Sequence, residues 1–141
     1  MGRILAIDYG TKRTGIAVTD PLRIVPGGLI TVATHELNAF LADYFSKESV
    51  DIVVVGYPTN MNGEESASMK QIRPFVDKLI KQYPDKKIVM FDERFTSVIA
   101  QRAILDSGIG RMARRNKALV DEVSATIILE SFMDSKQYKE I

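Results

Sequence analysis

The amino-acid sequence predicts a mixed α/β domain whose elements follow the order βββαβαβαα. Three observations favour this class. The chain begins with an apolar hairpin, its later apolar strands alternate with amphipathic helices, and its content of 45% hydrophobic and 26% charged residues is typical of globular proteins. Because 141 residues suffice for one domain with a sizeable core, we expect residues 1–141 to form a single domain.

The first three strands are expected to form an antiparallel meander. Residues 4–9 and 14–19 are apolar and flank a polar turn at residues 10–13, and a third strand follows at residues 29–33 after a Pro-Gly-Gly turn. Thr34 is the expected N-cap of the first helix. Apolar side chains at helical spacing then predict a helix that packs on one face: Leu37, Phe40, Leu41, Tyr44 and Phe45.

Strands and helices alternate in the rest of the chain. Residues 51–55 predict a strand that is covered on both faces, and residues 87–91 predict the fifth strand. Pro74 should bend the second helix or mark where its regular part begins. The apolar face expected for that helix comprises Met69, Ile72, Val76, Leu79 and Ile80. Helices are expected over residues 65–83, 97–107 and 118–134.

The composition excludes several kinds of site. With no Cys and one His, the chain cannot form disulfides or a zinc-thiolate centre, and a Ser/His/Asp triad is not expected. The net charge of +1 is too small for a protein that coats nucleic acid. The longest aliphatic run, residues 52–55, falls far short of the ~18 residues of a membrane span. We therefore expect a cytoplasmic protein without a membrane partner.

Carboxylates at strand ends are the strongest candidates for chemistry. Asp8 closes the first strand, where alternation puts it on the face of Ile4 and Ala6, and Asp92 and Glu93 follow the fifth. Side-chain alternation sends Asp92 and Glu93 to opposite faces, so only one of them should point where Asp8 points. Asp121 shares a helical face with small residues that let the helix approach the sheet. Each acid alone can instead cap a turn or pair with a cation, but three that converge are harder to explain in that way.

Clustered carboxylates predict a bound divalent cation. Carboxylates in one place raise each other's pKa unless a cation lies among them. Hard oxygen ligands favour Mg²⁺ or Mn²⁺ over zinc. Two such ions, about 3.5–4 Å apart with substrate bound, can activate a water and stabilise the leaving oxygen in phosphodiester cleavage.

Basic and amide side chains near these acids are candidates for contacts with nucleic acid. Four cations lie within residues 111–117 with no acid between them, which predicts either a phosphate-binding patch or an ordinary solvated loop. Arg94 can brace Glu93 or contact the nucleic-acid backbone, and the other candidates can equally be exposed turn residues. The predicted substrate-binding residues are Lys12, Arg13, Asn60, Arg94, Arg111, Arg114 and Arg115.

Four stretches of the chain resemble the YqgF/RuvX family of RNase H-like nucleases. They are DYGTKRTGIAVTD at 8–20, VGYPTNMNG at 55–63, FDERFTS at 91–97, and KALVDEVSA at 117–125. The resemblance implies an RNase H-like fold with a five-stranded mixed sheet, and a Mg²⁺-dependent hydrolase that matures the 5′ end of pre-16S rRNA. It also implies that the catalytic and metal-binding acids are Asp8, Glu93 and Asp121.

Three alternatives to rRNA maturation are open. A DNA endonuclease resembling Holliday-junction resolvases would act as a stable two-fold dimer, whereas RNA trimming fits a monomer or weak homodimer. A non-catalytic RNA-binding factor for ribosome-assembly intermediates would keep the fold and make little use of the acids. The Asp8-x-Gly-Thr-Lys motif also resembles the phosphate loop of the actin and sugar-kinase ATPases, but those proteins need two such domains.

Overall fold

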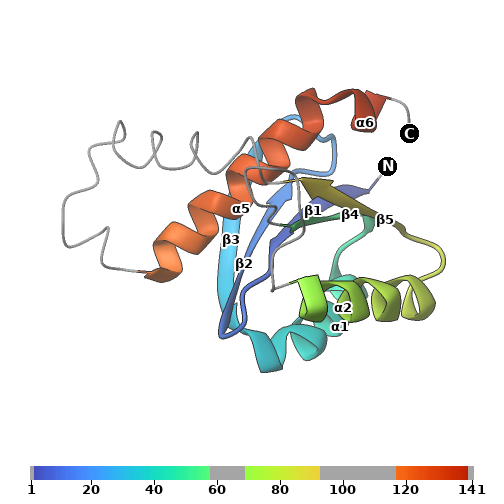
Figure 1. Cartoon of the computed structure of the whole chain (residues 1–141). Helices are drawn as coiled ribbons and strands as arrows, with labels where there is room; N and C mark the ends of the chain where they lie inside the picture. The colour runs from blue at the N-terminus through green and yellow to red at the C-terminus, as the bar shows by residue number, and fades with distance from the viewer. Residues whose placement is uncertain (1, 58–68, 93–116, 140–141) are drawn as a thin grey trace.

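The computed structural model describes residues 2–57, 69–92 and 117–139, and of residues 117–122 the backbone alone. A five-stranded mixed sheet lies at its centre, in the order β3-β2-β1-β4-β5 (Figure 1). β2 pairs antiparallel with β1 and β3, whereas β1, β4 and β5 run parallel. The predicted RNase H-like fold, led by an antiparallel hairpin, is thereby confirmed. The strands are β1 (Arg3–Asp8), β2 (Arg13–Thr19), β3 (Pro26–Ala33), β4 (Val50–Tyr57) and β5 (Lys87–Asp92).

Helices cover both faces of the sheet (Figure 1). The described helices are the 3-10 turn η1 (Thr34–Glu36), α1 (Leu37–Lys47), α2 (Met69–Gln82), α5 (Lys117–Asp134) and α6 (Lys136–Lys139). α1 and α2 pack on one face, and α5 lies across β1, β2 and β3 on the other. The helix predicted for residues 97–107 lies outside the described residues. Among the helices that the structure does describe, none has the length and apolar character needed to cross a bilayer.

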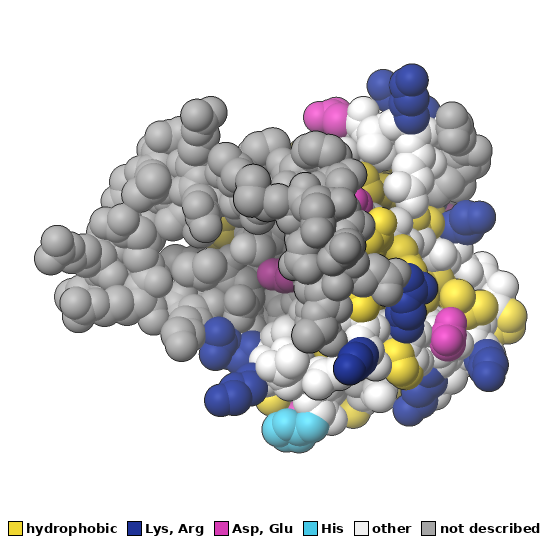
Figure 2. All heavy atoms as spheres, viewed as in Figure 1, with side chains coloured by type: hydrophobic (Ala, Val, Ile, Leu, Met, Phe, Trp, Pro, Cys, Tyr) yellow, Lys and Arg dark blue, Asp and Glu magenta, His cyan; other side chains and the backbone are white. Residues whose placement is uncertain are grey.

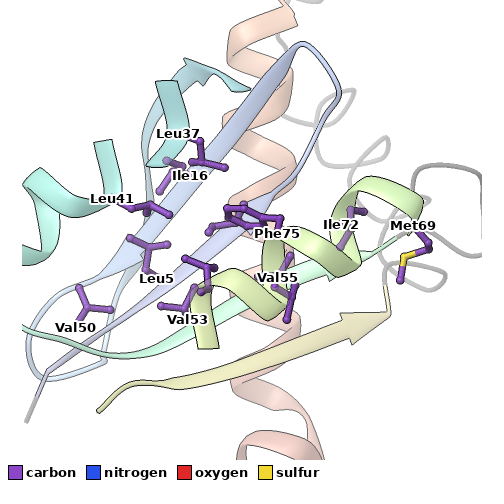
Figure 3. Close-up of a cluster of buried hydrophobic side chains, with 13 residues drawn as sticks. Leu5, Ile16, Leu37, Leu41, Val50, Val53, Val55, Met69, Ile72 and Phe75 are labelled. Carbon is purple, nitrogen blue, oxygen red and sulfur yellow. The ribbon is translucent and has the colours of Figure 1, made fainter. Parts of the chain in front are cut away.

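Strand alternation divides the core into two layers. Leu5 and Ile7 of β1 face α1 and α2 (Figure 3), whereas Ile4 and Ala6 face α5. All four side chains are fully buried, and each buried Ile or Leu contributes about 1.5–3 kcal/mol to folding. On the second layer, α5 supplies Ala125, Ile128, Leu129 and Phe132. β1 is thus packed on both faces, and this packing also fixes the position of its last residue, Asp8.

Two predictions about the helices are wrong in detail. α1 begins at Leu37, and Thr34 lies in η1 without capping either helix through its side chain. The buried face of α2 includes Phe75, which was not predicted to be buried. Ile80, which was predicted to be buried, is 49% exposed. Pro74 lies inside α2, so of its two predicted roles the start of the regular helix is excluded and the bend stays a prediction. Two neighbouring faces of this helix are apolar, and packing against the sheet buries the one that carries the larger Phe side chain.

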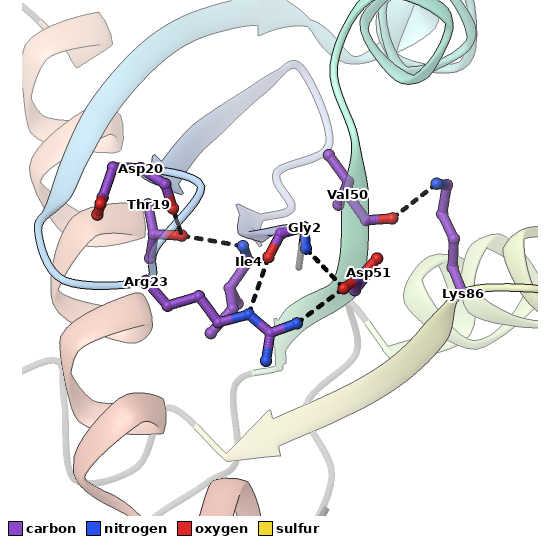
Figure 4. A network of polar contacts seen from close by, with 8 residues as sticks. All are labelled: Gly2, Ile4, Thr19, Asp20, Arg23, Val50, Asp51 and Lys86. Carbon is purple, nitrogen blue, oxygen red and sulfur yellow. Dashed lines mark hydrogen bonds and ion pairs between the residues drawn. The ribbon is translucent and has the colours of Figure 1, made fainter.

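A polar network closes the end of the sheet where β1 begins (Figure 4). The Asp51 carboxylate accepts hydrogen bonds from the backbone N–H of Gly2 (2.7 Å) and from the Arg23 guanidinium (3.0 Å). Arg23 Nε also donates to the Gly2 carbonyl (2.8 Å). These bonds hold Arg23 at a φ of 58°, a left-handed conformation that non-glycine residues seldom adopt.

The Asp20 carboxylate organises the adjoining loop and should make stability depend on pH. It accepts backbone N–H bonds from Val25 (2.8 Å), Ile24 (2.7 Å) and Leu22 (3.3 Å), and the bond from Val25 is the main cause of a lowered Asp20 pKa. Because folding lowers this pKa, the stabilisation is complete above the unfolded value of 3.8 and disappears as the pH falls through the folded value. Asp20→Asn should therefore lower the Tm at neutral pH, and the difference from wild type should shrink in acid. A constant difference across a series of thermal melts down to about pH 2.5 would contradict this account.

Candidate active site

The carboxyl ends of β1, β4 and β5 meet at one edge of the sheet because these strands run parallel (Figure 1). Their last residues are Asp8, Tyr57 and Asp92. In open α/β sheets, ligands bind at the carboxyl ends of parallel strands. The hairpin turn between β1 and β2 lies at the same edge, since it follows directly from Asp8.

Asp8 lies between two glycines. Its register partners are Gly15 on β2 and Gly56 on β4, and residues in register share one face of a sheet. Neither neighbour carries a side chain, so the two adjoining strands place no side chain in register with the half-buried Asp8. Alternation along β1 places Asp8 on the face of Ile4 and Ala6, which α5 covers. This is the face predicted for Asp8.

Asp92 lies on the opposite face of the sheet. Its partner is Tyr57, whose ring packs in the layer of α1 and α2. The preceding residue, Phe91, is in register with Gly56 and so shares the Asp8 face, where its ring meets Phe132 of α5 edge to face at 6.0 Å. Asp92 is thus directed to the α1 and α2 side of the sheet, away from the face of Asp8. Glu93, the predicted partner of Asp8, lies outside the described residues.

The other predicted acid, Asp121, is located only by its backbone. It lies in α5 one turn before Ala125, which is fully buried against the sheet. Among the described side chains, no three acids or histidines gather closely enough to hold a metal ion, and neither Glu93 nor Asp121 has a described side chain. The convergence of Asp8, Glu93 and Asp121 therefore stays a prediction. The substrate-binding candidates outside the described residues are Asn60, Arg94, Arg111, Arg114 and Arg115.

Two exposed cations follow Asp8: Lys12 in the turn and Arg13 at the first position of β2. Gly10 is required in this turn because a Cβ atom there would collide with the Arg13 carbonyl oxygen. The turn is bonded to η1, which contains the single histidine, and Figure 2 shows basic side chains gathered beside that histidine. A fixed, positively charged turn thus directly follows Asp8.

Sequence reasoning missed two features of this site. The two glycines beside Asp8 are separated from it by 7 and 48 positions, and only the register of three strands brings them together. The hydrogen bond from Thr34 to Gly10 of the turn was also missed. A threonine directly before a helical stripe has the pattern of an N-cap, and Thr34 was therefore predicted to be one. No signal in the sequence alone identifies either feature.

Comparison with known proteins gives concordant results. Residues 2–135 match the model of a family described as RuvX, Holliday junction resolvase. A protein of Porphyromonas gingivalis named "Putative pre-16S rRNA nuclease" is 64% identical over 96% of this chain and 98% of its own length. A protein of Phocaeicola vulgatus with the same name is 56% identical over 98% of this chain and 99% of its own length.

Among solved structures, YeaZ from Pseudomonas aeruginosa aligns with a TM-score of 0.46 and 18% identity, over 77% of this chain and 50% of that one. The family match and the curated relatives both extend over nearly the whole chain, including all the stretches on which the resemblance depends. The chain therefore belongs to the RuvX family.

Proposed function

We propose that this protein is a nuclease of the cytoplasm that hydrolyses a phosphodiester bond at the 5′ end of pre-16S rRNA with the aid of Mg²⁺ or Mn²⁺. The observation that carries the proposal is the position of Asp8, at the carboxyl end of a rigid strand with glycine on both neighbouring strands. The names of its nearly full-length relatives support rRNA as the substrate.

The residues proposed to hold the metal are Asp8, Glu93 and Asp121. The part of this set that the structure describes fits such a group, because Asp8 offers hard carboxylate oxygens at a strand end and its register partners are glycines, which add no competing side chain. When bound, the ion would supply Lewis-acid polarisation of the phosphate and a water of lowered pKa.

In this proposal, basic side chains of the protein bind and orient the substrate. Lys12 of the turn and Arg13 at the start of β2, both exposed, attract the phosphates on either side of the scissile bond. The buried layers on both sides of β1 hold Asp8 in a fixed place, so that the substrate and not the protein must adjust. Preorganisation of this kind lowers the cost of reaching the reactive geometry.

Junction-specific DNA cleavage is the second candidate, since the matching family model carries that description. A resolvase must cut two symmetric strands, which requires a two-fold dimer with two active sites. A monomer at micromolar concentrations in analytical ultracentrifugation would therefore favour RNA trimming, and a stable dimer would favour junction resolution.

One cleavage assay tests the proposed function. Purified protein is incubated with a pre-16S rRNA fragment and, separately, with a four-way DNA junction, each with Mg²⁺ or with EDTA. We expect the RNA to be shortened at its 5′ end only when Mg²⁺ is present. Cleavage of the junction alone would transfer the proposal to the resolvase activity, and binding without cleavage of either substrate would favour a non-catalytic assembly factor.

The basic cluster at residues 111–117 yields a separate prediction about substrate affinity. Replacing Arg111, Arg114 and Arg115 by Ala should weaken RNA binding and leave the rate at saturation unchanged, because these cations act on phosphates by charge. The slope of log K against log salt should fall by about 0.7 to 0.9 for each phosphate that is no longer neutralised. Fluorescence anisotropy across a salt series measures it, and an unchanged slope would show that the cluster is only a solvated loop.

A further inference from the structure

Thr34 joins the turn after Asp8 through both its side chain and its backbone. Its hydroxyl donates to the Gly10 carbonyl oxygen at 2.6 Å, and its N–H donates to the Lys12 carbonyl oxygen at 3.0 Å. Its Oγ1 also lies 3.0 Å from Oγ1 of Thr14, a fully buried residue of β2. Thr34 is therefore hydrogen bonded to the carbonyl groups of both Gly10 and Lys12, the residues on either side of Thr11.

The direction of the hydroxyl bonds follows from the chemistry of the partners. A carbonyl oxygen can only accept, so the single hydroxyl proton of Thr34 is committed to Gly10. The proton between the two hydroxyls must then come from Thr14. The result is a directed chain from Thr14 to Thr34 to Gly10, in which each bond polarises the next.

This series of hydrogen bonds ends at Gly10, in the segment that connects Asp8 to the two cations. Gly10 is two residues after Asp8, and Lys12 and Arg13 follow it. Exposed turns of polar residues sample several conformations unless bonds from outside the turn restrict them. Thr34 supplies two such bonds, and the close approach of Gly10 to the Arg13 carbonyl adds a steric restriction.

We propose that Thr34 is a positioning residue for substrate binding, which holds Lys12 and Arg13 at a fixed place beside Asp8 so that they receive the phosphates of the substrate. The proposal rests on the proposed nuclease function for its substrate, but its mechanism concerns the turn alone. A turn with more conformational freedom should bind the phosphates of the substrate more weakly, whereas Asp8 is unchanged. KM should therefore change more than kcat.

The test compares Thr34→Val, Thr34→Ser and Thr19→Val. Thr19 is a matched control, because it is a buried threonine at the opposite end of the sheet whose hydroxyl is hydrogen bonded to the Ile4 N–H and the Asp20 carbonyl. We expect Thr34→Val to raise KM and the Kd for an RNA fragment in EDTA by about tenfold, with kcat within about threefold of wild type. Thr34→Ser should bind like wild type, and Thr19→Val should lower the Tm without changing the Kd.

A double-mutant cycle shows whether Thr34 acts through the cations. In a Lys12→Ala/Arg13→Ala background, Thr34→Val should have no further effect on the Kd, since the groups that it positions are gone. An equal loss in both backgrounds, or an unchanged Kd for Thr34→Val, would overturn the proposal. If Thr34→Val does not fold, Thr14→Val takes its place, with a smaller rise in Kd expected and an unchanged Kd counting against the proposal.

The Kd in EDTA separates this proposal from the proposed function. A wild-type protein that binds RNA and does not cleave it with Mg²⁺ would refute the nuclease while the Kd values still decide the role of Thr34. A protein that cleaves normally, with Thr34→Val indistinguishable from wild type, would refute the role of Thr34 alone.

Discussion

Asp8→Asn should abolish metal-dependent cleavage while the fold stays intact, with a loss in kcat/KM of about 10³-fold or more. Metal-assisted charge stabilisation amounts to several kcal/mol, and each 1.36 kcal/mol is a factor of ten in rate. The Tm in metal-free buffer should be unchanged or higher, because the substitution removes one charge from the proposed cluster of Asp8, Glu93 and Asp121. Cleavage assays and thermal melts measure the two effects, and Asp121→Asn should behave in the same way.

Asp51→Asn is the matched control for this substitution. Asp51 is also an aspartate of the central sheet, but it lies at the opposite end, where it accepts from Gly2 and Arg23. Its substitution should lower the Tm and preserve cleavage, the reverse of the pattern expected for Asp8. If Asp8→Asn instead lowers the Tm strongly in metal-free buffer, Asp8 is a structural cap and the site assignment is wrong.

Glu93→Gln should eliminate cleavage and weaken Mg²⁺ binding, whereas Asp92→Asn should preserve both. The reason is the register of β5: Asp92 pairs with Tyr57 on the face of α1 and α2, away from Asp8. Side-chain alternation predicts the opposite face, that of Asp8, for Glu93. Cleavage rates and calorimetric titration with Mg²⁺ check the pair. An equal loss for Asp92→Asn would show that Asp92 reaches the site despite its face.

The sequence predicts the strands and their faces well because period-two patterns are local. The alternation of Ile4, Ala6 and Asp8 is visible within five residues, and the structure places Asp8 on the predicted face. The same holds for the hairpin and for α1, whose stripe faces the sheet. Local patterns are sufficient here because successive side chains of a strand point to opposite faces of its sheet.

Features that depend on contacts between distant segments could not be predicted. Thr34 before a helical stripe has the pattern of an N-cap, but its hydroxyl is bonded to Gly10, 24 residues earlier. Two neighbouring faces of α2 are likewise similar in hydrophobicity, so helical periodicity does not choose between them. Packing against the sheet buries Phe75 and leaves Ile80 exposed. A tertiary hydrogen bond or contact decides between local choices that the sequence alone leaves nearly equal.

The most direct test of the central claim is anomalous scattering from a crystal of the protein grown or soaked with Mn²⁺. The claim is that Asp8, on the face of the sheet covered by α5, anchors a divalent cation together with Glu93 and Asp121. The account predicts an anomalous peak in direct contact with the Asp8 carboxylate, absent in Asp8→Asn crystals. A peak held by Asp92 without Asp8, or occupied equally in Asp8→Asn crystals, would contradict it.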